Sequence, residues 1–338
     1  MLYGTPNPWL DDKQGRNEVS LGIMRALGVT LVAGAALLAP ERAGAVDWAK
    51  VPEKSITLFY PAQISWDRLF TPGRHSGQRR YPEKTCVGCH GDIDEGPLGD
   101  SLVDAEKDKE PAPIAGKPPF VKAKVKTAHE NGQLLVRLEF DPGKQPKVPM
   151  DKEFETKVTM ILDDGGVKEA KQAGCWLTCH SDVESMRWSV PGTTKYLSDT
   201  RIPKSGGDVI KSPVELAKMR AAGNFLEYWQ ARINPGKPAV VVDGTILEKR
   251  AAHEKPAVKV TSTVTKGVYT VIFSRALDAG PDHKKIVPDK KYTVGFAIHA
   301  GNTSQRFHYV SFERSLMLDG IEGVADLLAP GSSAGTGR

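Results

Sequence analysis

Short runs in which hydrophobic and polar residues alternate dominate this chain, and such runs are typical of β-strands that bury one face. The predicted strands are residues 56–60, 121–127, 133–140, 156–162, 257–265, 268–275, 292–299 and 306–312. Turn residues separate consecutive runs at Asn131-Gly132 and at Lys266-Gly267, which favours antiparallel hairpins. The pattern therefore predicts a mainly β fold in which antiparallel strands pack as in a β-sandwich.

Helical signals are fewer and flank these runs. Residues 65–70 are predicted to form a short helix, and residues 212–222 begin with Ser-Pro-Val-Glu, a good helix start. Residues 225–232 are rich in large side chains and are predicted to form a packed helix. The polar, proline-rich residues 96–119 are predicted to be a loop or linker.

The closing hairpin, residues 292–312, sets the positions of two histidines. With residues 301–304 as a four-residue loop, Ala297 lies opposite His308. His299 is then the diagonal neighbour of His308, about 7–8 Å away at the backbone, and both side chains project from one face. Two such residues cannot bind one iron from opposite sides, so at most one can serve each iron.

The candidate chemistry centres on Cys86-Val87-Gly88-Cys89-His90. Two thiols separated by two residues can each form a thioether with a haem vinyl group, and the histidine that follows reaches the iron as proximal ligand. This spacing predicts covalent attachment of haem c through Cys86 and Cys89, with His90 as an iron ligand. A redox-active disulfide is the alternative, but it leaves His90 without a role.

A second, looser copy of the motif has three residues between Cys175 and Cys179, and His180 follows. The two motifs use all four cysteines of the chain. We therefore predict two covalently attached haem c groups, with Trp176 either covering the edge of the second haem or packing against the domain. A structural disulfide or half of a zinc site is the alternative, although zinc would need a second cysteine pair nearby.

The distal iron ligands are sought among the remaining histidines and methionines. His75 lies shortly before the first motif and is the leading candidate for the first haem, unless it is a surface loop residue. The alternatives are His299 or no protein ligand at all. His308 and Met186 are the candidates for the second haem, and a methionine ligand would raise its reduction potential relative to a second histidine.

Residues 24–45 have the features of a secretory signal: a basic residue, an apolar run, and small residues before Val46. We predict that residues 1–45 are a cleaved signal peptide, with Met24 as an alternative start, and that the mature chain is periplasmic. The apolar run is shorter than the roughly 20 residues of a membrane-spanning helix, so a retained anchor is the less favoured alternative. Thioether attachment also belongs to a compartment outside the cytoplasm.

Composition and charge agree with a globular protein of 338 residues, 40% of them hydrophobic. Lysine and arginine exceed aspartate and glutamate by 46 to 41, and the propionates of two haems would offset most of this excess, so nucleic acid is not a predicted partner. Tyr228 and Trp229 either wall a haem pocket or are core aromatic residues. The predicted organisation is a signal peptide (1–45), an N-terminal haem c segment with linker (46–120), a β-rich haem-binding domain with the second haem site (121–328) and a disordered tail (329–338).

Several stretches resemble one known family: residues 56–61 before the first motif, residues 172–180 with Met186, residues 226–231, and the hairpin strands 292–299 and 306–311. The family is the haem-binding domain typified by the haem subunit of ethylbenzene dehydrogenase and related molybdenum enzymes of the DMSO reductase type, in its c-type dihaem branch. The resemblance implies a β-sandwich-like haem domain whose pocket lies between sheet and flanking helices. It also implies electron transfer rather than substrate chemistry.

One departure from that family concerns the ligands. The ethylbenzene dehydrogenase subunit holds a non-covalent haem between methionine and lysine, whereas this sequence carries two attachment motifs ending in Cys-His. Within the resemblance, His308 falls roughly in the segment that supplies the lysine, which favours His308 over Met186 for the second haem.

These features together predict a periplasmic dihaem c-type cytochrome that relays single electrons between redox partner proteins and is not an enzyme. One alternative is a haem c subunit of a larger molybdenum-enzyme or respiratory complex. A dihaem peroxidase-like enzyme is less favoured, because nothing in the sequence requires an open position at either iron.

Overall fold

The computed structural model describes residues 46–60, 84–91, 97, 114–175, 180–181, 195–202, 209–305 and 307–331. All of them fall within one compact unit, Ala43–Arg338. The predicted signal peptide, the helix at 65–70, most of the linker and the tail from residue 332 lie outside the described residues. The same holds for four predicted site residues, which are His75, Trp176, Cys179 and Met186.

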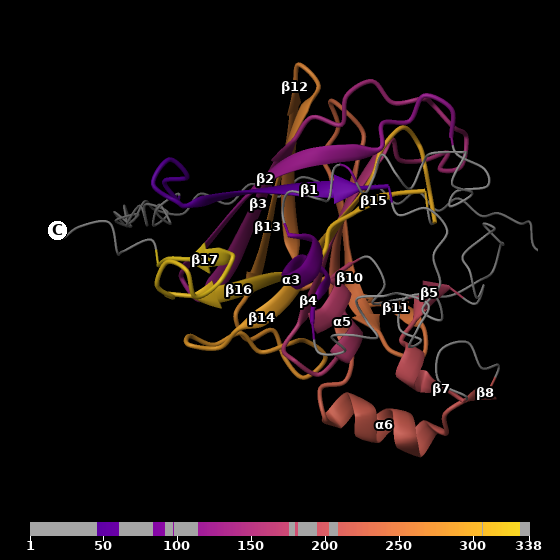
Figure 1. The fold of residues 1–338 in the computed structure, drawn as a ribbon, viewed down its shortest axis with the longest axis vertical. Coiled ribbons are helices and arrows are strands. Elements are labelled where there is room, and N and C mark those ends of the chain that lie inside the picture. Colours follow the sequence, from indigo (N-terminus) through magenta and orange to yellow (C-terminus); the bar gives the residue numbers. More distant parts are fainter. Residues whose placement is uncertain are drawn as a thin grey trace, which may run out of the picture. The chain divides into compact units, whose positions relative to one another are not determined.

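One sheet dominates the fold (Figure 1). Its strands are β1 Glu53–Phe59, β2 Phe120–Glu130, β3 Gln133–Phe140, β4 Thr156–Asp163, β9 Leu226–Ile233, β10 Val240–Ile246, β11 Arg250–Ala252, β12 Lys259–Thr265, β13 Val268–Ala276, β14 Tyr292–His299, β15 Tyr309–Val310, β16 Arg314–Leu318 and β17 Leu327–Ala329. Neighbouring strands follow the order β11-β10-β9-β4-β14-β15-β1-β2-β3-β13-β12, and β16 pairs with β14 and β17. Among the described strands of this sheet, only β16 and β17 pair in parallel.

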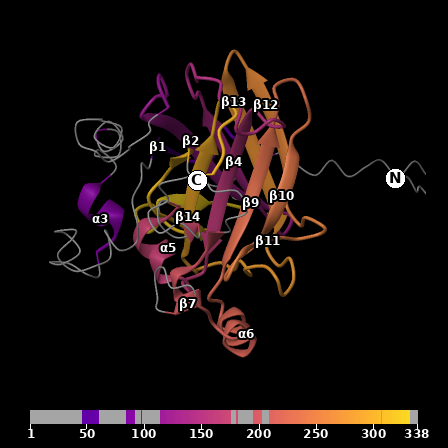
Figure 2. The same ribbon diagram turned by 90° about the vertical axis from the view of Figure 1, so that its right-hand side faces the viewer.

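The sheet folds back on itself, so that its two halves share one inner core. Buried residues of β1, β2, β3 and β13 belong to the same hydrophobic cluster as those of β4, β9 and β14. Figure 2 shows strands of both halves. Two contacts join them: the Thr156 hydroxyl donates to the Tyr269 hydroxyl oxygen at 3.2 Å, and the ring centroids of Trp229 and Phe273 lie 6.2 Å apart. The predicted antiparallel, sandwich-like β fold is confirmed.

The hairpins predicted at Asn131-Gly132 and Lys266-Gly267 are also confirmed. β2 pairs with β3, and β12 with β13, across these two-residue loops. The φ angles are 49° and 69° in the first loop and 52° and 85° in the second. Two successive positive values match the type I′ turn, in which glycine at the second position is free of strain.

Residues 225–232, predicted to form a helix, are instead strand β9. This strand lies between β4 and β10 and is buried on both faces. A strand covered on both sides shows no alternation of polar and apolar residues, so periodicity cannot distinguish it from a buried helix. The helix prediction is wrong for that reason.

The closing hairpin differs from its predicted register. Ala297 pairs with Val310 rather than His308, so the pairing is shifted by two residues, and only residues 309–310 form a strand in the second arm. The same register, continued by one pair, places His299 directly opposite His308 instead of diagonal to it. Because the shift is an even number of residues, both histidines stay on the predicted face.

The loop of this hairpin is longer than predicted because it packs on residues 151–154. The side-chain amide of Asn302 donates to the carbonyl oxygens of Asp151 and Phe154 at 3.0 and 3.3 Å. The Asp151 N–H donates in turn to the Asn302 carbonyl at 2.8 Å. These contacts between segments distant in sequence outweigh the local preference for a four-residue loop.

A second buried cluster covers the outer face of β4, β9, β10 and β14. Helix α5 (Lys168–Ala173) and residues 196–197 contribute to it, and helix α3 (Cys86–His90) contacts α5. Helix α6 (Pro213–Ala221) begins at Ser212 with a capping box, which confirms the predicted helix start. Among the described residues, no helix is long and apolar enough to cross a membrane.

Candidate functional site

The outer face carries a β-bulge where β14 changes partner from β15 to β16. The pairing register changes by one residue there, so that residues 311–313 lie opposite residues 295–296. The Ser311 N–H donates to the Phe296 carbonyl at 2.9 Å, and the Ser311 hydroxyl oxygen accepts the Phe296 N–H at 3.0 Å. Such bulges redirect side chains and are frequent beside functional sites.

The second cysteine motif begins directly on this bulge. A Cβ atom added to Gly295 would lie 3.0 Å from the Cβ of Cys175 and closer still to its backbone nitrogen. A Cβ atom added to Gly174 would lie 2.6 Å from the Cα of Glu313, and Gly174 has a φ of 55°, which favours glycine. The two glycines therefore allow Cys175 to rest against the sheet.

The first cysteine motif, in α3, reaches the same bulge. The Val87 N–H donates to Oε1 of Glu313 at 2.9 Å, and the His90 ring stacks on Phe312 with centroids 5.8 Å apart. Burial raises the pKa of Glu313 to about 7, so this carboxyl group titrates near neutral pH. Both cysteine motifs are thus anchored at residues 312–313.

A pocket opens on the outer face beside Cys175. It contains about 440 Å³ of space between atoms, part of which is open solvent. Its walls combine apolar side chains, two histidines and two basic residues. The lining residues are Thr159, Ile161, Cys175, Lys195, Tyr228, Gln230, Ile246, Arg250, Ala297, His299 and His308.

Two of these residues, His299 and His308, have stacked rings with centroids 4.8 Å apart and planes inclined by 11°. Nε2 of His299 donates to the Gln305 carbonyl at 2.9 Å, and its Nδ1 has no hydrogen-bond partner among the described residues. Burial, followed by the charges of His308 and Lys157, lowers the pKa of His299 well below its usual value. The His299 ring is therefore neutral at pH 7, which is the form that binds metals.

The pocket residues fit a covalently attached haem. Cys175 supplies a thiol, Ile161 and Ile246 supply apolar walls, and the histidines supply imidazoles. Lys195 and Arg250 supply cations suited to propionate carboxylates.

The two aromatic residues Tyr228 and Trp229 point to opposite faces of β9. Tyr228 lines the pocket, and the Arg250 guanidinium lies over its ring at 4.2 Å. Trp229 belongs to the inner core, where its Nε1 donates to Glu227 at 2.6 Å. The structure therefore places Tyr228, but not Trp229, at the candidate haem site.

The remaining predicted ligands are described to different extents. Cys86, Cys89 and His90 form α3, which is only partly covered. The backbone of His180 pairs with Tyr196 in the small sheet formed by β5 (His180–Ser181) and β6 (Lys195–Tyr196). His75, Trp176, Cys179 and Met186 lie outside the described residues, so their predicted roles stay predictions.

Sequence reasoning did not identify Gly295, Glu313 or Arg250. Gly295 had a usable signal, because glycine inside a strand often marks a bulge or a close approach of another backbone. Glu313 and Arg250 had none, because each acts on residues brought close only by the fold.

Comparisons with solved structures give no guidance on this site. No protein family model matches the chain. A putative carbohydrate-binding protein from Bacteroides uniformis is 9% identical, covering 64% of this chain and 83% of its own, with a TM-score of 0.31. A carbohydrate binding module of family 9 from Caldicellulosiruptor kristjanssonii is 13% identical, covering 67% and 82%, with a TM-score of 0.27. Values this low support no conclusion.

Two curated proteins match over most of their length. Cytochrome c-552 of Stutzerimonas stutzeri is 30% identical over 291 residues, which cover 85% of this chain and 91% of the cytochrome. Cytochrome c-551 of Rhodocyclus tenuis is 30% identical over 284 residues, which cover 82% of this chain and 97% of the cytochrome. With its Cys-x-x-Cys-His motif held against the β-bulge at residues 312–313, the chain belongs to the same family of c-type cytochromes as these two proteins.

Proposed function

We propose that this c-type cytochrome carries two haem c groups and relays single electrons between partner proteins in the periplasm. The observation that carries the proposal is the convergence of both cysteine motifs on one β-bulge. Val87 of the first motif donates to Glu313, while Gly174, next to Cys175, packs on the same residue. Two redox groups held on one rigid element can exchange electrons without any movement of the chain.

When bound, each haem supplies a one-electron iron centre, and the protein supplies attachment, orientation and burial. In this proposal His90 and His180 are the proximal ligands. Strand β14 fixes the position of Cys175 through Gly295. Ile161 and Ile246 line the pocket wall with apolar side chains.

Export to the periplasm rests on the signal-like residues 24–45 and on the chemistry of thioether attachment. We also propose that the haem domain is related to the haem subunit of ethylbenzene dehydrogenase. This relationship concerns the haem domain only. A molybdenum-enzyme partner receives no support from the relatives, whose names describe cytochromes.

The number of haems is tested by the mass of the mature protein, expressed with its leader in a host that matures c-type cytochromes. We expect the chain from Val46 plus two haem masses, and two electrons per chain in a reductive titration. The paired variants Cys86→Ala/Cys89→Ala and Cys175→Ala/Cys179→Ala should each keep one covalent haem under denaturing conditions. A wild-type protein with one haem, or one that turns over peroxide rapidly, would contradict the proposal.

The distal ligand of the second haem is expected to be His308. A metal lies in the plane of the imidazole that binds it, so the stacked rings of His299 and His308 cannot bind one iron from opposite sides. His299 donates its Nε2–H to the Gln305 carbonyl, a bond that metal-binding histidines also make, so the preference for His308 rests on the family resemblance.

His308→Ala should convert the second haem from low spin to high spin, whereas His299→Gln should leave it low spin with a shifted potential. Electronic absorption and magnetic resonance spectra of the two variants measure the difference. Met186→Ala is the matched comparison. A methionine-to-iron charge-transfer band that is lost in Met186→Ala, together with a low-spin His308→Ala protein, would assign the ligand to Met186 instead.

A further inference from the structure

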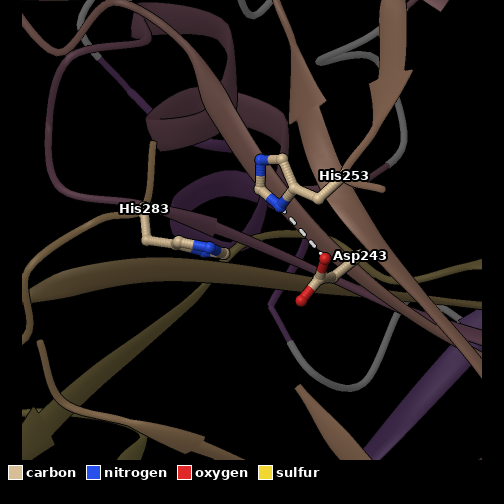
Figure 3. A group of neighbouring side chains, drawn as sticks. All are labelled: Asp243, His253 and His283. Atoms are coloured by element: carbon tan, nitrogen blue, oxygen red, sulfur yellow. Dashed lines mark hydrogen bonds and ion pairs between the residues drawn. The ribbon is translucent and has the colours of Figure 1, made fainter. Parts of the chain in front are cut away.

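Three potential metal ligands meet on the inner face of the sheet, away from the pocket: Asp243, His253 and His283 (Figure 3). Asp243 lies in β10 and pairs with Trp229, so it shares the inner face with that residue. His253 follows β11, and His283 lies in the connection from β13 to β14. One donor atom of each residue lies within 4.8 Å of those of the other two.

The carboxylate of Asp243 is buried and held in a fixed orientation. Its Oδ2 accepts the backbone N–H groups of Ala257 and Val258 at 2.7 and 2.8 Å. Its Oδ1 faces His253, whose Nδ1 lies 3.0 Å away, as drawn in Figure 3. The side chain of His253 is 20% exposed, which gives an ion a way in from solvent.

His283 is oriented by a second buried carboxylate. Its Nδ1 lies 3.2 Å from Oε1 of Glu227, and its ring centroid lies 4.5 Å from that of His253. Histidines that bind metals usually donate their second ring N–H to a carboxylate, which fixes the ring and raises its basicity. Glu227 occupies this position and leaves Nε2 of His283 as a metal donor.

We propose that Asp243, His253 and His283 bind a divalent transition-metal ion of the zinc class. Two imidazole nitrogens and one carboxylate oxygen form a donor set that zinc accepts, with water in the fourth position. Two atoms bonded to one zinc ion at about 2.0–2.1 Å lie roughly 3–3.5 Å apart. The 3.0 Å between Oδ1 of Asp243 and Nδ1 of His253 agrees with this value.

The neutral ring of His253 carries its proton on Nε2 in the bound form, so that Nδ1 offers its lone pair to the ion. The ion then joins β10 to the connections that follow β11 and β13, and it acts as a structural tie.

A metal-free hydrogen-bonded cluster is the competing explanation. His129 and Asp319 form such a simple pair, with Nε2 of the histidine 2.8 Å from the carboxylate. The cluster at Asp243 differs by its second imidazole and by the carboxylate behind that imidazole. Arg275 pairs with Glu227 at 3.1 Å, whereas the ion pair that Asp243 makes among the described residues is with His253.

The test uses the haem-loaded protein without a histidine tag, first stripped with EDTA and then incubated with zinc sulfate. After desalting, elemental analysis should find one zinc ion per chain in addition to the haem iron. His253→Gln and His283→Gln should each weaken zinc binding, as measured by competition with a fluorescent zinc chelator. The loss of affinity should exceed the roughly 10–100-fold that is typical when a residue that only orients a metal ligand is removed. His129→Gln, the matched control, should bind as the wild type does.

Two further measurements keep the test independent of how the variants fold. Zinc should raise the Tm of the wild type while its haem spectra stay unchanged, because the site faces away from the pocket. An anomalous difference map at the zinc edge should show a peak between Asp243, His253 and His283. Wild-type protein that retains no zinc, a peak elsewhere, or variants that bind like the wild type would each overturn the proposal.

Discussion

Replacing Gly295 by alanine should abolish attachment of the second haem and leave the first in place. The added methyl group would lie 3.0 Å from the Cβ of Cys175 and closer to its backbone nitrogen. Neither contact is with the end of a flexible side chain, so the backbone itself must move. Cys175 is buried against the sheet, and a shift of the chain there moves its thiol away from the pocket.

The Gly295→Ala protein should have a mass lower than the wild type by one haem. Gly320→Ala is the matched control, because its added Cβ would meet only the side chains of Leu328 and Met317, both at 3.0 Å, and these can turn aside. The control should keep two haems and lose little stability. Two covalent haems with unchanged potentials in Gly295→Ala would show that the sheet does not position Cys175.

Local patterns were sufficient for much of the fold. The residues Asn131 and Gly132 both accept the positive φ angles that the turn requires, and buried and less buried residues alternate along the flanking strands. This pair therefore specifies its own hairpin. The Ser212 capping box likewise depends on residues three positions apart. In such cases the physical cause lies within a few residues, so the sequence alone predicts the structure.

The failures occur where a distant segment decides the outcome. β9 is buried on both faces by elements that include distant ones such as α5 and β13, so its own pattern carries no strand signal. The closing loop is lengthened by the contact of Asn302 with Asp151, and this contact changes the partner of His308. The cysteine motifs were found because covalent chemistry requires a fixed spacing, whereas Glu313 and Arg250 required the folded sheet.

The buried pair of Glu227 and Arg275 should have the largest effect on stability among the described ion pairs. Arg275 Nη1 lies 3.1 Å from Oε2 of Glu227, and both side chains are fully buried. The same carboxylate accepts the Trp229 indole N–H at 2.6 Å and the Lys284 backbone N–H at 2.7 Å. Removal of its charge leaves a buried guanidinium without compensation.

Glu227→Gln should therefore lower the free energy of unfolding by about 3–5 kcal/mol. Urea unfolding followed by far-ultraviolet circular dichroism, in EDTA to exclude metal effects, measures the change. Asp278→Asn breaks an exposed pair with Lys285, in which the two side chains are 59% and 67% exposed, and should change stability far less than Glu227→Gln does. Adding Arg275→Met to Glu227→Gln should recover part of the loss, because no buried charge is then left unpaired.

The pH dependence of the Glu227→Gln effect separates the lost charge from a mere change of shape. Burial alone would raise the pKa of Glu227, but the hydrogen bond from His283, the charge of Arg275 and the hydrogen bond from Trp229 together hold it below the ordinary value of 4.5. A carboxylate with a lowered pKa stabilises the folded state fully above its unfolded pKa, and this stabilisation is lost as the pH falls through the folded pKa. The difference in unfolding free energy between wild type and Glu227→Gln should thus be constant from pH 8 to about 5 and shrink below about pH 4.5. A difference that stays the same down to pH 3 would mean that the variant is destabilised by altered packing, and the charge pair would then contribute nothing.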